Sequence, residues 1–538
     1  ELPWTMQMHQ VGLDYEDGGV YTFEFWIRAD RTAPVDVIAR LDHAHPESGR
    51  YEVVGLNTTF DATTEWQKRT VVFKAREPRP NGNRIGFTFP NERGEFWIAR
   101  ASLRPGGRLG GPRPGQSLAE RNLLRPLRRG PLETEWRDWI ECVTRIEQSY
   151  FSEMRQFLKN ELGVKCPVIG TQVSYGDIFG VDREDDMDYA DMHAYWEHPR
   201  FPGRPWDMSN WRVGNSPMVA STNGGILLRL ARHRIAGKPF VVSEFNHPNP
   251  SWYASECWPM MASFAALQDW DGLVIHNYVN YPPEDWQERH FTHLFDTAAS
   301  PQKAPFLPAA AVLFRQAAVA PARGRAILRV GHETVVPMLA DGDGALAALW
   351  EKTLPGTQAA LERRLACTVS PGAALPTVER TGGPEETGAV RWKRYKDEGD
   401  ALYTVETPLV KVAVGRLSGR TVSVGGLLLE LGPISTGHAA VKLVSLDERP
   451  VEASKRLLLT VAGRMKNTGW TWRPDKAMLT DWGTSPTRIE VIPGTVKLQR
   501  SGPALRAHAL DGRGNRMDPV RTTQDGDTLI LRLTPDTK

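Results

Sequence analysis

The sequence predicts a multidomain protein that combines an α/β region with all-β regions. Three observations lead to this fold class. The chain has 538 residues, which is too long for one ordinary domain. Its first hundred residues alternate apolar and polar side chains with the period of β-strands. Between about 131 and 323, apolar strands alternate with helical patterns, and short strands return from 324 to 538.

Residues 1–106 are expected to form a β-sandwich module. In the run 21–28 one face carries four apolar residues and the other carries Thr22, Glu24, Trp26 and Arg28; the apolar four are Tyr21, Phe23, Phe25 and Ile27. Similar runs cover 66–73, 83–89 and 95–103, and turn-forming residues separate them. Trp26 lies on the polar face, where it could serve as a sugar platform, whereas Trp97 is expected to be core.

Residues 107–130 are rich in Gly, Pro and Arg, which is typical of a linker. After it the sequence predicts helices at 136–162, 224–235, 255–268 and 308–319, and strands at 167–170, 190–195, 239–243 and 272–275. Strands that alternate with helices pair in parallel. A closed barrel needs eight strands, so four indicate either an open sheet or a barrel of which half is absent. Residues 324–538 are expected to form one or two accessory β-sandwich lobes.

Composition excludes several function classes. A net charge of +2 argues against a nucleic-acid partner. No apolar run is long enough to cross a membrane. No signal peptide opens the chain, and Glu1 suggests a start within a longer protein. The four scattered cysteines predict no zinc site and no disulfide framework. Eighteen tryptophans favour a carbohydrate partner only slightly, because large cores also use tryptophan.

The strongest candidate for chemistry is Glu244. It follows the apolar strand 239–243, and Phe, Asn246, His247 and Pro come next. Barrel enzymes keep catalytic groups at the carboxyl tips of their strands, and retaining glycosidases need a carboxylate nucleophile there. The alternative is a Glu that caps a helix or forms an ion pair.

The preceding strand carries His193 and Tyr195 on one face, two residues apart. A Tyr hydroxyl can donate to the nucleophile and keep it ionised. A pair that is satisfied within a core is the alternative. The loop that follows contains candidate sugar-binding side chains, although such a loop could also cover a small core of its own; they are Trp196, His198, Trp206 and Trp211.

The strand ends Asp-Met-His-Ala-Tyr-Trp and Val-Ser-Glu-Phe-Asn-His-Pro, followed by Leu-Gln-Asp-Trp-Asp-Gly, resemble the C-terminal half of a cellulase-like (β/α)8 glycoside hydrolase. Within that clan (clan A) the pattern is most similar to family 5. The resemblance implies strands five to eight of a TIM barrel within 131–323, Glu244 as nucleophile, and Tyr195 and His193 as its supports. Tyr278 would lie under the reactive sugar, where most relatives have Trp.

The N-terminal run Tyr-Thr-Phe-Glu-Phe-Trp-Ile-Arg-Ala-Asp, with Gly-Glu-Phe-Trp-Ile-Ala and Trp66, resembles a family 4/9-type carbohydrate-binding module. Some cellulase-like proteins insert such a module inside the barrel. The resemblance therefore implies a secreted or periplasmic retaining hydrolase of a β-1,4-glucan or mannan, with a polysaccharide or oligosaccharide as partner and no cofactor. A structural calcium is implied by resemblance alone, and no metal ligand set is visible.

The chain departs from that family in one respect. The acid/base Glu should follow an Asn at the end of the fourth strand, but the Asn-Glu pairs at 91–92 and 160–161 lie elsewhere. The expectation is a piece that lacks strands one to four and the acid, is inactive alone, and has the other half of the barrel as a partner. The alternative is a non-catalytic carbohydrate-binding or scaffold protein with a degenerate α/β domain. An unrelated hydrolase is weaker, because no Gly-x-Ser-x-Gly elbow is present.

Overall fold

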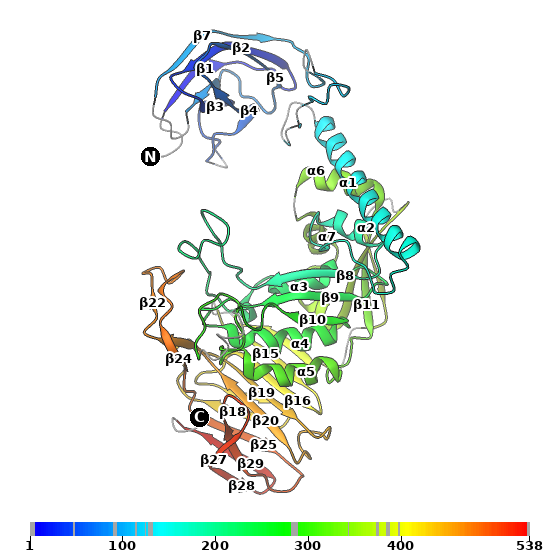
Figure 1. Cartoon of the computed structure of the whole chain (residues 1–538), viewed down its shortest axis with the longest axis vertical. Helices are drawn as coiled ribbons and strands as arrows, with labels where there is room; N and C mark the ends of the chain where they lie inside the picture. The colour runs from blue at the N-terminus through cyan, green and yellow to red at the C-terminus, as the bar shows by residue number, and fades with distance from the viewer. Residues whose placement is uncertain are drawn as a thin grey trace. The chain divides into compact units, whose positions relative to one another are not determined.

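The computed structural model (Figure 1) describes residues 6–46, 49–89, 94–112, 116–123, 125–126, 128, 133–280, 289–342, 344–372, 376–383, 388–395 and 399–534. The chain divides into two compact units, 1–147 and 148–538. Each unit is described by itself.

The first unit contains a β-sandwich. One sheet has the order β1-β6-β3-β4, formed by Gln7–Leu13, Asn83–Thr88, Ala33–Leu41 and Val53–Ala62. The other has the order β5-β2-β7, formed by Gln67–Lys74, Val20–Ala29 and Phe96–Pro105. All the pairings are antiparallel. Phe25 and Ile27 are fully buried between the sheets, whereas Glu24, Trp26 and Arg28 alternate with them and face outward. The expected sandwich is confirmed.

The second unit opens with the end of α1 (Glu133–Gln156), which widens into one π-helical turn at Phe157–Glu161. A three-stranded parallel sheet follows, in the order β10-β9-β8. Its strands are β8 (Ala190–Tyr195), β9 (Phe240–Asn246) and β10 (Gly272–Ile275). Three helices precede or separate these strands, namely α2 (Ile178–Glu184), α3 (Gly225–His233) and α4 (Cys257–Leu267), and α5 (Leu307–Arg315) comes after them. These positions match the predicted alternation of strands and helices.

The strand expected at 167–170 does not form. Only an isolated parallel bridge joins Gln172 to Asp191 beside β8. The backbone N–H groups that a strand would offer to a neighbour go to carboxylates instead: Val168 donates to Asp188 (2.8 Å), while Gly170 and Thr171 donate to Glu184 (2.9 and 3.0 Å). The sheet therefore has three strands, and a partial (β/α)8 barrel is not confirmed.

Residues after 324 are less uniformly β than expected. Strands β11 (Gly324–Gly331) and β12 (Arg363–Ser370) pair in parallel, and β13 (Thr377–Thr381) joins β11 antiparallel. Helices α6 (His332–Asp341), α7 (Ala345–Thr353) and α8 (Gln358–Glu362) form the crossover that a parallel pair requires. All three are short, and α6 contains Pro337, which hid the helical pattern.

The C-terminal lobe is a sandwich of two five-stranded antiparallel sheets. The first is β14-β15-β16-β19-β20, formed by Val390–Arg394, Ala401–Glu406, Val410–Arg416, His438–Ser445 and Leu457–Ala462. The second is β17-β18-β25-β29-β28, formed by Thr421–Val424, Leu427–Leu431, Gly494–Gln499, Thr528–Leu533 and Thr522–Asp525. Strands β26 (Ala507–Leu510) and β27 (Arg516–Val520) form a separate pair.

This lobe is not an independent accessory domain. Helices α4 and α5 lie between the parallel sheet and the sheet that contains β16 and β19 (Figure 1), and one apolar core runs through all of these layers. Inside it, the hydroxyls of Ser263 on α4 and Tyr403 on β15 are hydrogen-bonded (2.8 Å). The lobe and the α/β region therefore form one compact unit.

Among the described helices, none combines the length and apolar character needed to cross a membrane. All four cysteines are free thiols; Cys257 and Cys367 are buried, and Cys142 and Cys166 are exposed.

Candidate functional site

Glu244 lies near the carboxyl end of β9, with its side chain 32% exposed. In the parallel pairing of β8 and β9, His193 lies opposite Glu244, and Tyr195 follows two residues later. Side chains two residues apart on a strand share a face, so all three point to the same side of the sheet. The predicted juxtaposition of Glu244, His193 and Tyr195 is therefore present.

Three groups converge on one oxygen of Glu244. The Tyr195 hydroxyl donates a short hydrogen bond to Oε2. His193 Nδ1 lies 3.1 Å from the same oxygen, and His276 Nδ1 lies 3.9 Å from it. Burial raises the pKa of Tyr195, and the hydrogen bond to Glu244 and its charge add to the effect, so the phenol stays protonated and remains a donor.

A second carboxylate, that of Asp191, lies near the ring nitrogen of His193 that does not face Glu244. Asp191 accepts the backbone N–H (3.0 Å) and the hydroxyl (2.7 Å) of Ser243, and its Oδ2 lies 3.5 Å from His193 Nε2. The backbone N–H of His193 donates to Gln172 Oε1 (2.9 Å). The imidazole therefore sits between Asp191 and Glu244, and its orientation is set by both.

Aromatic rings extend from Tyr195 towards solvent. The rings of Tyr195 and Phe295 are 4.8 Å apart, Phe295 and His198 5.5 Å, and His198 and Trp206 5.7 Å. Trp206 is 58% exposed. These rings give the open side of the Glu244 site an apolar and aromatic wall, which suits the C–H face of a sugar ring. Two members of the predicted set, His198 and Trp206, are thus connected to the site.

His276 and Phe295 belong to the site but were not predicted from the sequence. His276 follows the last residue of β10, so it comes to the same sheet edge as Glu244. Its position directly after a strand was a usable signal. Phe295 lies in an irregular segment, twenty residues after the end of β10, where no periodicity marks it.

Four predicted sugar-binding residues point into the protein instead, which corrects the expectation for Trp196, Trp211, Asn246 and His247. The last three are fully buried. Asn246 uses its Nδ2 to hold the carbonyls of His276 and Phe295 (both 2.6 Å). Trp196 follows Tyr195 and therefore faces the other side of β8, where its indole N–H donates to the Ser216 carbonyl (2.8 Å).

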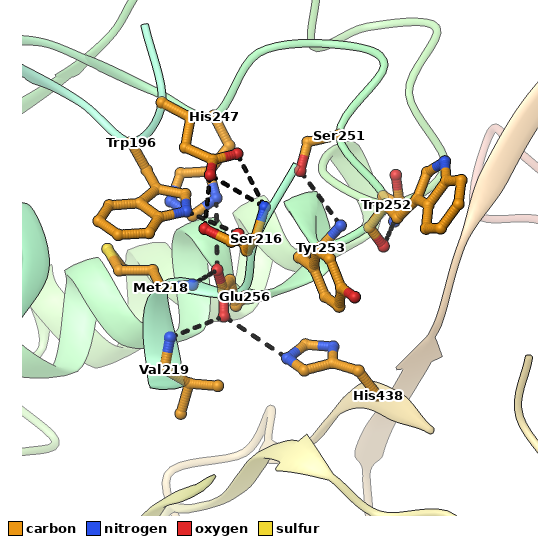
Figure 2. A network of polar contacts seen from close by, with 12 residues as sticks. Trp196, Ser216, Met218, Val219, His247, Ser251, Trp252, Tyr253, Glu256 and His438 are labelled. Atoms are coloured by element: carbon orange, nitrogen blue, oxygen red, sulfur yellow. Dashed lines mark hydrogen bonds and ion pairs between the residues drawn. The ribbon is translucent and has the colours of Figure 1, made fainter. Parts of the chain in front are cut away.

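A sealed polar cluster lies behind this face of β9 (Figure 2). Glu256 accepts the backbone N–H groups of Met218 (2.5 Å) and Val219 (3.1 Å). His247 and His438 approach its two oxygens at 3.9 and 3.5 Å. Burial, together with the charges of Lys303 and His438, lowers the pKa of His247 to about 3, so its ring is neutral at ordinary pH. This cluster has no exposed carboxylate and is structural.

The last two predicted residues, Tyr278 and Trp26, have no described contact with Glu244 or with the aromatic rings beside it. Tyr278 is 55% exposed, and its carbonyl accepts the N–H groups of Thr297 (3.0 Å) and Ala298 (2.8 Å). Trp26 lies in the first unit, on the outer face of the sheet β5-β2-β7.

That outer face carries more aromatic residues than predicted. The guanidinium of Arg28 lies 4.4 Å from the ring centroid of Trp97 and 5.4 Å from that of Trp66, which is 42% exposed. The expectation that Trp97 belongs to the core is wrong, because Trp97 pairs with the outward-facing Arg28 across the strands. Trp26 stands two residues from Arg28 on the same face, so tryptophans from β2, β7 and the start of β5 share one surface.

The described residues contain no group of three His, Cys, Asp or Glu side chains that could hold a metal ion. The contacts of Glu244 given above involve Oε2, and within the described part of the chain none of them comes from a second carboxylate.

Comparisons with known proteins reach only a small part of the chain. No protein-family model matches it, and no curated protein matches it. Solved structures that resemble it include a module described as CBM4 (22% identity, TM-score 0.17) and the N-terminal cellulose-binding domain of Cellulomonas fimi β-1,4-glucanase C (20%, 0.16). A carbohydrate-binding module specific for non-crystalline cellulose, CBM28, is a third (10%, 0.15).

Each of these alignments covers 19% of this chain, and they cover 63, 69 and 68% of the other chains. The chain thus spans less than two thirds of the first of them. At such TM-scores the likeness carries no argument about this chain. The chain has a β-sandwich with carbohydrate-binding modules among its structural neighbours, and the family 5 hydrolase resemblance finds no support in these comparisons.

Proposed function

We propose that this protein acts on β-linked glycans. In this proposal Glu244 is the nucleophile of a retaining glycoside hydrolase site, and the N-terminal β-sandwich binds the polysaccharide. One observation carries the catalytic part: Tyr195 and His193 converge on Oε2 of a half-exposed Glu244 at the carboxyl edge of parallel strands. A secreted or periplasmic location is part of the proposal, because polysaccharides occur outside the cytoplasm.

The geometry assigns separate roles to the two carboxylate oxygens. Oε2 receives the phenol and the imidazole, which fix the rotamer of the carboxylate. Oε1 is the oxygen that we assign to the attack on the anomeric carbon. The C–O bond to the leaving group then breaks and a glycosyl ester forms on Glu244, which water later hydrolyses.

The site needs a second carboxyl group about 5–5.5 Å from the first, as proton donor to the leaving oxygen. We propose that it comes from further strands that pair beside the three-stranded sheet, either as a barrel half in the same protein or as a partner. The support is that both edges of β10-β9-β8 lack a full neighbouring strand among the described residues, whereas parallel sheets are normally extended and covered.

A substrate with a very good leaving group tests the nucleophile without the acid. Dinitrophenolate needs no proton to depart, so a dinitrophenyl β-cellobioside with fluorine in place of the 2-hydroxyl should trap the glycosyl ester. We expect one equivalent of dinitrophenolate to be released by the full chain. Peptide mass spectrometry should place the sugar on Glu244, and the matching β-mannobioside probe compares the two sugar classes.

Glu244→Gln is the matched control, because it keeps the side-chain shape and removes the nucleophile. The variant should release no burst and carry no label. If the wild-type chain is not labelled by either probe while it still binds the sugars, Glu244 is not a nucleophile and the hydrolase proposal is abandoned.

The second candidate function is non-catalytic glycan binding. The exposed Trp66, together with Trp26 and Trp97 on the outer face of β5-β2-β7, favours it, since flat indole faces stack on sugar rings. Calorimetric titration with cellohexaose should then show binding that Trp66→Ala weakens at least several-fold and Glu244→Gln leaves unchanged. Retained affinity in Trp66→Ala would remove this face from glycan recognition.

A further inference from the structure

A long hairpin of the C-terminal lobe leaves the sandwich between β20 and β25. This arm, residues 465–489, contains β21 (Met465–Thr468), β22 (Thr471–Trp472), β23 (Leu479–Asp481) and β24 (Thr484–Ile489). Its strands pair only with one another, β21 with β24 and β22 with β23, and belong to neither five-stranded sheet. In Figure 1, β22 and β24 project from the lobe on the side where the loop after β8 lies.

The arm is bonded to both segments that flank the Glu244 site. On the loop after β8, the backbone N–H of Val213 donates to the carbonyl of Ala477 (2.8 Å). On the segment after β10, the buried Asn467 donates to the carbonyl of Phe291 (2.6 Å). One backbone–backbone bond and one buried bond from the Asn467 side chain thus tie the arm to both segments.

Apolar packing continues this connection to the site itself. A small core, separate from the main one, joins Met478 and Leu479 of the arm to Trp211, Val213, Leu294 and Phe295. Tyr195 packs against the same core, and its ring lies 4.8 Å from that of Phe295. The arm therefore shares a core with Phe295, and Phe295 in turn packs against the ring of Tyr195, whose hydroxyl is bonded to Glu244.

We propose that the arm is a positioning element of the Glu244 site, which holds Phe295 against the Tyr195 ring and thereby keeps the phenol on Glu244. The proposal rests on the proposed function for its catalytic consequence, but the effect on Tyr195 is independent of it. Met478 and Leu479 act through Phe295 and touch no reacting atom, so they are positioning residues.

Met478→Ala and Leu479→Ala test this, because each empties part of the small core next to Phe295. Leu498→Ala is the matched control: Leu498 is an equally buried residue of the same lobe, but it lies in the core between the two five-stranded sheets. Met478→Leu restores the packing volume and should behave as the wild type.

The first measurement is nitration of Tyr195 by tetranitromethane, followed by peptide mass spectrometry, with the exposed Tyr278 as internal reference. Tetranitromethane attacks the ionised phenol, which burial and Glu244 suppress at Tyr195. We expect nitration of Tyr195 relative to Tyr278 to rise at least several-fold in Met478→Ala and Leu479→Ala, and to stay unchanged in Leu498→Ala and Met478→Leu. An unchanged ratio in both alanine variants, or an equal rise in Leu498→Ala, overturns the proposal.

The second measurement is labelling of Glu244 by the fluorinated dinitrophenyl cellobioside. Misplacing a supporting group slows the bond-forming step more than it weakens binding, so the first-order labelling constant should fall on the order of tenfold while the dissociation constant of the probe stays constant. A changed nitration ratio without any labelling of the wild type refutes the hydrolase proposal and leaves the positioning role intact. Normal labelling in all variants with an unchanged nitration ratio refutes the positioning role alone.

Discussion

Strand β9 carries two polar clusters that begin two residues apart and have opposite surroundings. At Glu244 the carboxylate is 32% exposed, and its partners Tyr195, His193 and His276 all approach the same oxygen, Oε2. At Asn246 and His247 the exposed fraction is zero: the Asn246 amide holds two backbone carbonyls of neighbouring segments, and the ring of His247 lies 3.9 Å from the buried Glu256. Similar residue types thus serve different purposes according to whether neighbouring segments cover them.

The difference teaches that a carboxylate near a histidine is not a site by itself. Glu256 also has two imidazoles nearby, but it is sealed and its oxygens cap the N–H groups of Met218 and Val219. A buried group of this kind should affect folding, whereas a half-exposed group should affect chemistry. The free energy of unfolding separates the two clusters.

The largest effect is expected from Glu256→Ala. The substitution leaves two buried N–H donors without an acceptor, at about 1–3 kcal/mol each, so the free energy of unfolding of unit 148–538 should fall by about 4 kcal/mol. The midpoint of its urea transition, followed by tryptophan fluorescence, measures this. Glu256→Gln keeps one acceptor oxygen and should lose about half as much. A loss below about 1 kcal/mol for both variants would show that the sealed cluster does not hold this region.

A somewhat smaller effect is expected at Lys303, which belongs to the sealed cluster. Its Nζ donates to Asn246 Oδ1 (3.1 Å) and to the carbonyl of His247 (3.2 Å). Burial lowers the pKa of Lys303 from 10.5 to about 8. The unfolded chain therefore binds more protons than the folded one between pH 8 and 10.5, and the free energy of unfolding should rise with pH across this window.

The total rise is on the order of 3 kcal/mol for this one group. Lys303→Met removes the titration and nearly keeps the length of the side chain. Urea transitions of the wild type and of Lys303→Met, measured from pH 7 to 10.5, should therefore diverge with pH, while groups common to both cancel. Parallel pH profiles would mean that Lys303 titrates in the folded protein as it does in water.

The sequence predicted the elements around β9 well but could not separate these two clusters. Short strand-like runs located β8, β9 and β10, and the two-residue period placed His193 and Tyr195 on one face of β8. Burial of Asn246 and His247 depends on tertiary contacts, such as those with the segment containing Phe295, 49 residues from Asn246 along the chain, and with Glu256 before α4. No local pattern contains that information.

The errors elsewhere have equally physical reasons. The strand expected at 167–170 was lost because side-chain carboxylates of Asp188 and Glu184 took its backbone donors, which periodicity does not register. The helices after β11 are too short for a clear period. The arm at 465–489 was not distinguished from the other short strands of the lobe, because its contacts with Val213 and Phe291 join segments far apart in the sequence.

The smallest effect is expected at the open cluster. Glu244→Gln keeps an acceptor for the Tyr195 hydroxyl, and Tyr195→Phe removes one donor from a carboxylate that water can still reach. Each variant should therefore change the free energy of unfolding by no more than about 1 kcal/mol, since water replaces the lost partner. The same urea titration applies, with Glu256→Ala beside it as the sensitive case. A loss of about 3 kcal/mol in either variant would place Glu244 with the sealed cluster, because only a group that the fold depends on and water cannot reach has that cost.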